Sequence, residues 1–185
     1  MPDKDGFFLG IDVGSVSTNL VIINGFGEIC HKEYLRTQGR PIAAVQAGLA
    51  AIREALPNIM VTGVGATGSG RQLAGAIIGA DIVKNEITTH AVAATHFQPD
   101  VQTVVEIGGQ DSKMIILREG VVTDFAMNTV CAAGTGSFLD QQAARLGIPI
   151  AEFGEIALQA ENPVRIAGRC TVFAESDMIH KQQID

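Results

Sequence analysis

Two stretches of this sequence can be laid over each other, and together they restrict the fold more than any other feature. FLGIDVGSVSTNLVII begins at Phe8, and VVEIGGQDSKMIIL begins at Val104. Each reads as an apolar strand that ends in an acid and a glycine, followed by a turn and a second apolar strand. One such turn is a weak signal, but two in the same context favour duplicated lobes around a cleft. We expect an α/β fold with one lobe over residues 1–100 and a second over residues 101–185.

The hydrophobic pattern and the turn residues predict the other elements. Asn24, Gly25 and Gly27 favour an antiparallel meander near the N-terminus, and Glu119-Gly120 favours a later hairpin. Strands are expected over 7–13, 18–24, 27–36, 59–64, 101–107, 113–118, 121–127 and 164–167, and helices over 41–56, 69–79, 86–97, 137–146, 150–160 and 171–183.

Charge and cysteine content exclude several classes of protein. The 185 residues carry a net charge of −7, which argues against nucleic acid or an anionic membrane surface as a general partner. We see no signal peptide and no apolar run long enough to span a membrane. Three cysteines without a secretion signal indicate a reducing compartment, and we expect a cytoplasmic protein.

Each acid–glycine turn has the composition of a phosphate site. Glycine lets backbone amides approach phosphate oxygens, and the carboxylate of Asp12 could hold hydrated Mg²⁺. In the second turn, Gln110 could position an attacking water and Asp111 could orient a metal-bound water. The alternative is an ordinary strand-end turn, and the pairing of the two turns favours phosphate. The candidate residues are Asp12, Gly14 and Ser15 in the first turn and Glu106, Gly108, Gly109, Gln110 and Asp111 in the second.

Two of the cysteines are expected to lie just before helices. Cys131 is in NTVCAAGTGSFLD and Cys170 is in GRCTVFAESD, without a C-x-x-C pair. A helix N-terminus lowers the pKa of a thiol, and two such thiolates are half of a Cys₄ set that a symmetric dimer could complete. Two buried apolar cysteines are the alternative, and the residues alone favour it.

Other candidates are weaker. Glu86 and His90 are four residues apart on an expected helix and could form a ligand pair, although a solvated or mutually hydrogen-bonded pair is the simpler interpretation. The stretch from Ala66 to Arg71 (ATGSGR) has the composition of an anion-binding loop. Cys30 lies in an expected strand and is assigned no role.

Six motifs, taken in order, resemble a known family: the activators of 2-hydroxyacyl-CoA dehydratases, which include the ATPase subunits of benzoyl-CoA reductases. The resemblance covers nearly the whole chain, and the last three motifs are specific to that family. The motifs are GIDVGS (10–15), ATGSGR (66–71), NEITTHA (85–91), EIGGQDSK (106–113), CAAGTGSFLD (131–140) and CTVFAESD (170–177).

The resemblance implies an actin-like, hexokinase-like ATPase fold with ribonuclease H-like duplicated lobes and MgATP between them. It also implies a homodimer that holds one [4Fe–4S] cluster through Cys131 and Cys170 of each protomer. ATP hydrolysis would drive an electron from a carrier such as ferredoxin or flavodoxin into a dehydratase or reductase under anaerobic conditions. The implied ATP-binding residues are Asp12, Gly14, Ser15, Val16, Ser17, Thr18, Asn19, Gly108, Gly109 and Gln110, with Gln110 and Asp111 catalytic.

The chain departs from the family pattern in two ways. The first turn usually continues with Thr and ends in Lys, where this chain has Val16 and Asn19, so a cation directed at phosphate is missing. The family also continues past residue 185 with an adenosine-binding turn, so the second lobe is expected to be incomplete. Two alternatives stay open: an actin-like small-molecule kinase with buried thiols, and a non-catalytic actin-like interaction module.

Overall fold

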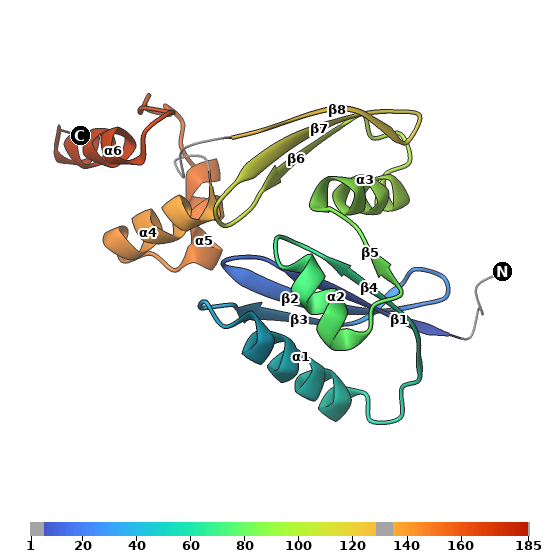
Figure 1. Cartoon of the computed structure of the whole chain (residues 1–185). Helices are drawn as coiled ribbons and strands as arrows, with labels where there is room; N and C mark the ends of the chain where they lie inside the picture. The colour runs from blue at the N-terminus through green and yellow to red at the C-terminus, as the bar shows by residue number, and fades with distance from the viewer. Residues whose placement is uncertain (1–5, 129–134, 185) are drawn as a thin grey trace. The chain divides into compact units, whose positions relative to one another are not determined.

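The computed structural model describes residues 6–128 and 135–184. The chain divides into two compact units, of which the first is Met1–Gln102 with Arg118–Val122 and the second is Thr103–Leu117 with Thr123–Asp185. Each unit contains one β-sheet, drawn in blue and green in the first and in yellow in the second (Figure 1).

The first sheet has five strands in the order β3-β2-β1-β4-β5. β1 pairs antiparallel with β2, and β2 with β3, which confirms the expected meander. β4 runs parallel to β1, and β5 runs parallel to β4, so the chain crosses over through a helix before each of these strands. The strands are β1 (Phe7–Val13), β2 (Ser17–Asn24), β3 (Ile29–Arg36), β4 (Val61–Thr67) and β5 (Ile82–Val83).

The core of this unit lies between the sheet and two helices, α1 (Pro41–Ala55) and α2 (Arg71–Ile78). Buried and half-buried residues alternate along β1 and β2, as a sheet with one covered face requires. Gly48 lets α1 approach closely, because a Cβ there would overlap the side chain of Leu20. The core side chains are Leu9, Ile11, Val13, Leu20, Ile22, Val45, Ile52, Ala66 and Ala74.

A third helix, α3 (Glu86–Phe97), follows β5 and begins where the sequence predicts. Asn85 caps it, since its side-chain oxygen accepts a hydrogen bond from the amide of Thr88 (2.9 Å). Within residues 6–128 and 135–184, no helix combines the length and the apolar character that crossing a membrane requires.

The second sheet has three strands in the order β6-β7-β8. Glu119 (φ 52°) and Gly120 (φ 74°) form the expected turn between β7 and β8, with the positive φ angles of a type I′ hairpin. The strands are β6 (Thr103–Ile107), β7 (Ser112–Arg118) and β8 (Val121–Met127), and three helices follow: α4 (Gly136–Leu146), α5 (Ile150–Leu158) and α6 (Thr171–Ile184).

Three expectations about the strands were wrong. β4 extends to Thr67, because parallel pairing with β1 continues to Asp12 despite the two glycines in the strand. The two-residue strand β5 was missed, since it carries too few residues for a pattern. The segment 164–167 is not a strand; the amide of Ala167 instead donates to the Asp177 carboxylate on α6 (2.9 Å).

Candidate functional site: two matched turns

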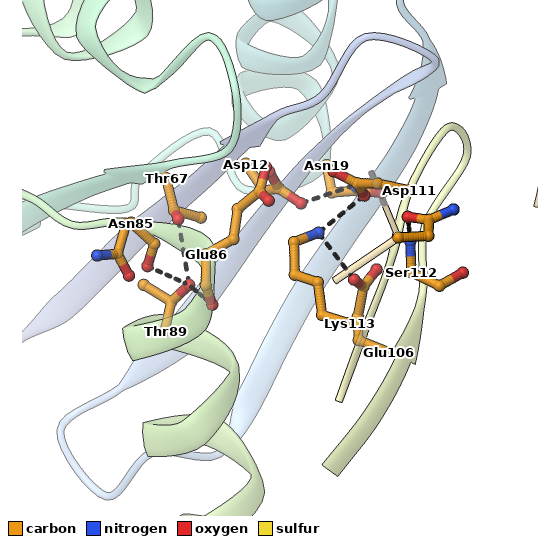
Figure 2. A network of polar contacts seen from close by, with 11 residues as sticks. Asp12, Asn19, Thr67, Asn85, Glu86, Thr89, Glu106, Asp111, Ser112 and Lys113 are labelled. Carbon is orange, nitrogen blue, oxygen red and sulfur yellow. Dashed lines mark hydrogen bonds and ion pairs between the residues drawn. The ribbon is translucent and has the colours of Figure 1, made fainter. Parts of the chain in front are cut away.

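The first candidate site is the four-residue turn, 14–17, between β1 and β2. The amide of Gly14 donates to the carbonyl of Ser17 (2.8 Å) and closes the turn. At the end of the strands, Asp12 on β1 lies opposite Asn19 on β2, whose side-chain amide donates to the Asp12 carboxylate (3.4 Å; Figure 2). The carboxylate expected to hold Mg²⁺ therefore stands at the base of the turn expected to bind phosphate. Of the other candidate residues, Ser15 and Val16 lie in the turn, and Thr18 is fully buried.

The loop between β4 and α2 supports this turn. The amide of Gly70 donates to the carbonyl of Val13 (2.8 Å). Gly68 has a φ of +93°, and a Cβ at this position would overlap both the Asp12 carboxylate and the Val13 carbonyl. Arg71 donates to the carbonyl of Gly68 (3.1 Å) and so braces its own loop. The ATGSGR stretch thus holds the end of β1 in place.

Glu86 also belongs to this end of the sheet. It lies in the first turn of α3, and Figure 2 shows its side chain directed toward Asp12. The helix is tied to β4 because the hydroxyls of Thr67 and Thr89 lie 3.1 Å apart, and the Thr89 hydroxyl also donates to the Glu86 carbonyl (3.0 Å). The i,i+4 pairing with His90 obscured this placement in the sequence. Sequence reasoning missed this placement because β5, the strand that leads into α3 and runs parallel to β4, carries too few residues for a pattern.

The second candidate site is the turn 108–111 between β6 and β7, and it is built like the first. The amide of Gly108 donates to the carbonyl of Asp111 (2.8 Å), again three residues further on. Ile107 pairs with Ser112, just as Val13 pairs with Thr18, so both turns leave their strands in the same register. The sequence alignment of the two stretches is therefore confirmed at the level of backbone hydrogen bonds.

The cross-strand pair beside the second turn carries a cation. Lys113 lies opposite Glu106, the position that Asn19 holds opposite Asp12. Its ammonium donates to the Glu106 carboxylate (3.0 Å) and to the Asp111 carboxylate (2.8 Å; Figure 2). The sequence analysis gave Lys113 no role, although its place opposite an acid in the repeat was the signal.

The start of α4 orients the second turn. The amide of Gly136 donates to the carbonyl of Gly108 (2.8 Å), and the amide of Ser137 donates to the carbonyl of Gly109 (3.0 Å). In a planar trans peptide the carbonyl and the following N–H point in opposite directions. The amides of Gly109 and Gln110 are therefore both directed away from α4, on one side of the turn. Adjacent amides aimed the same way form an anion-binding surface.

The structure describes two of the three cysteines, Cys30 and Cys170. Cys131 falls in 129–134, outside the described residues. Cys170 is half-buried and immediately precedes α6, where its carbonyl accepts from the amide of Ala174 (2.9 Å), so its expected place before a helix is confirmed. Cys30 is exposed on β3. Among residues 6–128 and 135–184, no three or more His, Cys, Asp and Glu side chains are grouped to hold a metal ion.

Comparisons with known proteins agree with this architecture. Residues 9–185 match the model of the BadF/BadG/BcrA/BcrD ATPase family. The chain is 37% identical over 179 residues to the (R)-2-hydroxyglutaryl-CoA dehydratase activating ATPase of Acidaminococcus fermentans, across 94% of this chain and 66% of that protein. The chain therefore spans slightly less than two thirds of this relative.

Two solved structures have the same fold. One is the dehydratase component A from Acidaminococcus fermentans (TM-score 0.84, 35% identity, 97% of this chain and 69% of that one). The other is the activator of the 2-hydroxyisocaproyl-CoA dehydratase from Clostridium difficile with bound ADPNP (TM-score 0.79, 32% identity, 96% and 66%). The expected α/β, actin-like and hexokinase-like ATPase fold is confirmed.

Proposed function

Since the chain belongs to the BadF/BadG/BcrA/BcrD ATPase family, we propose that it binds MgATP through the turns 14–17 and 108–111. We further propose that ATP hydrolysis activates a 2-hydroxyacyl-CoA dehydratase or a related acyl-CoA reductase. The observation that carries the proposal is the matched closure of the two turns, each with a carboxylate at its base. The similarity to a dehydratase activator that binds ADPNP supports it.

In this proposal each turn has its own task. The Asp12 carboxylate would hold hydrated Mg²⁺, and the amides of the first turn would contact phosphate oxygens. The amides of Gly109 and Gln110 contact the γ-phosphate, and the Gln110 side chain positions the attacking water. Asp111 would orient water of the hydrated Mg²⁺. Hydrolysis then needs alignment and charge stabilisation, without a covalent intermediate.

The electron-transfer part of the proposal concerns Cys131 and Cys170. Two copies of the chain would contribute four thiolates, the set that a [4Fe–4S] cluster requires. Cys170 fits such a role because it is only partly buried and immediately precedes α6. The cluster would supply one low-potential electron to the partner enzyme. A ferredoxin or flavodoxin would then reduce the cluster again.

We expect Gln110→Ala to lower the kcat of ATP hydrolysis by at least about tenfold with little change in KM, since the side chain acts on the water and not on the bound nucleotide. Phosphate release by the full-length protein, without any acceptor substrate, measures this. Gln102→Ala, at an exposed residue immediately before β6, is the matched control and should behave as wild type. ATP consumption that needs a sugar or a carboxylate as phosphate acceptor would contradict the proposal and favour a kinase.

Iron content tests the proposal that the protein binds a [4Fe–4S] cluster. We expect about four irons per dimer in protein purified without oxygen, and almost complete loss in Cys131→Ser and Cys170→Ser. Cys30→Ser, at an exposed cysteine without an assigned role, should retain the iron. Iron and sulfide analysis with visible and EPR spectra measures this. A folded dimer that takes up no iron after reconstitution would contradict the electron-transfer proposal.

A further inference from the structure

In each sheet, the residue that follows the third strand along the chain forms hydrogen bonds to the candidate turn or to the residue next to it. Thr37 follows β3, and it donates twice to the first turn: its amide to the carbonyl of Val16 (2.8 Å) and its hydroxyl to the carbonyl of Gly14 (2.9 Å). Asn128 follows β8 and forms hydrogen bonds to both backbone groups of Ser112, the residue after the second turn. Its amide donates to the Ser112 carbonyl (3.1 Å), and its side-chain oxygen accepts from the Ser112 amide (2.8 Å).

The contact at Thr37 is part of a buried chain of hydroxyls. Thr37 is 3% exposed and Thr18 is fully buried, with their hydroxyl oxygens 3.0 Å apart. Because the Thr37 hydroxyl has a single proton and donates it to Gly14, Thr18 must be the donor to Thr37. Thr18, Thr37 and the Gly14 carbonyl thus form a directed chain that ends at the first turn.

These contacts fix the orientation of two peptides in the first turn and of the peptide that closes the second turn. The carbonyls of Gly14 and Val16 face Thr37, so the N–H groups of Ser15 and Ser17, which share those planar peptides, face the other way. In the second turn, the Ser112 amide faces Asn128, so the Asp111 carbonyl of the same peptide is turned toward the Gly108 amide that closes the turn.

We propose that Thr37 and Asn128 are positioning residues of the nucleotide site. Thr37 sets the direction of the phosphate-facing amides of the first turn, and Asn128 holds the peptide whose Asp111 carbonyl closes the second turn. Neither side chain contacts the nucleotide; each acts through the peptide that it holds. The inference rests on the proposed function, because the direction of the amides matters for activity when the turns bind phosphate.

The test compares Thr37→Val with Thr37→Ser in the full-length protein. Valine keeps the shape of threonine but loses the hydroxyl, whereas serine keeps the hydroxyl. We expect valine to weaken the binding of MgADPNP by about tenfold and serine to stay within about twofold of wild type. Thr62→Val is the matched control. The Thr62 hydroxyl on β4 donates to the carbonyl of Phe7 (3.1 Å), which begins β1 at the end far from the first turn. It should leave the affinity unchanged.

The second turn gives an independent readout. Asn128→Ala removes the acceptor for Ser112, and we expect it to lower kcat by about tenfold with a smaller change in KM, because that turn is assigned to the γ-phosphate and water. This split between kcat and KM tests the second turn even if Thr37→Val does not fold. Circular dichroism and the unfolding midpoint establish that each variant is folded.

The outcomes separate this inference from the proposed function. Wild-type affinity in a folded Thr37→Val, or equal loss in the serine and valine variants, would overturn the role of Thr37 alone. An unchanged kcat in Asn128→Ala would overturn the role of Asn128. A wild-type protein that binds no nucleotide would overturn the proposed function and this inference with it.

Discussion

Replacing Gly68 by alanine is expected to lower the free energy of unfolding by about 3 kcal/mol and to weaken MgATP binding by about 10²-fold. Two effects add at this position. The φ of +93° strains any L-residue, and the new Cβ would overlap the Asp12 carboxylate and the Val13 carbonyl. To relieve the overlap, the end of β1 must move, and with it the carboxylate assigned to Mg²⁺.

Two other glycines separate these effects. Gly79, which ends α2, has a φ of +64° but open space around its Cβ position, so Gly79→Ala carries the backbone strain alone, about 1 kcal/mol. Gly70 has a φ of −90°, and its Cβ would lie 2.7 Å from a methyl of Val13, so Gly70→Ala carries the overlap alone.

Chemical denaturation and nucleotide titration of the three alanine variants measure these effects. Gly79→Ala should bind MgATP as wild type does, whereas Gly68→Ala should not. Equal stability and equal affinity in the Gly68 and Gly79 variants would show that the loop between β4 and α2 does not hold Asp12, and would remove this loop from the site.

Much of the fold could be predicted because local pattern and turn chemistry agree with it. The helix over 86–97 was placed correctly, and Asn85 caps it in the structure. The two acid–glycine turns could be aligned because each follows an apolar strand and precedes another. The match extends to the hydrogen bonds of Gly14 and Gly108.

The rest depends on contacts between strands that have no local signal. The strand expected over 59–64 was ended before Gly65, yet pairing with β1 continues through Gly65 to Thr67. Thr37 and Asn128 are single polar residues after a strand, and their role appears when the neighbouring turn is in place. Lys113 looks like a surface residue of a strand until the register sets it opposite Glu106.

Lys113→Met is the second change with a large expected effect. The Lys113 side chain is 4% exposed and lies between two carboxylates, Glu106 at 17% and Asp111 at 41% exposure. Methionine keeps most of the apolar stem but removes the cation, which leaves two like charges beside the second turn. We expect a loss of about 2 kcal/mol in the free energy of unfolding, less than for a fully buried pair because Asp111 reaches water.

The same change should also impair the hydrolysis of MgATP. Without the ammonium, Asp111 and Glu106 add uncompensated negative charge next to the turn assigned to the γ-phosphate. The first turn supplies no cation at the matching position, where it has Asn19. We expect kcat/KM for MgATP to fall by at least about tenfold, since a hydrogen bond to a charged group is worth about 1.5–3 kcal/mol. Steady-state phosphate release measures it.

Two further variants test whether the lost ion pair causes the effects of Lys113→Met. Lys181→Met, on the exposed face of α6, changes the net charge equally and should leave kcat/KM unchanged. In the double variant Lys113→Met/Glu106→Gln, the amide removes one of the two stranded charges, so part of the lost stability and turnover should return. If the double variant is as impaired as the sum of the single changes, the two side chains act independently, and the buried ion pair is not what shapes the second turn.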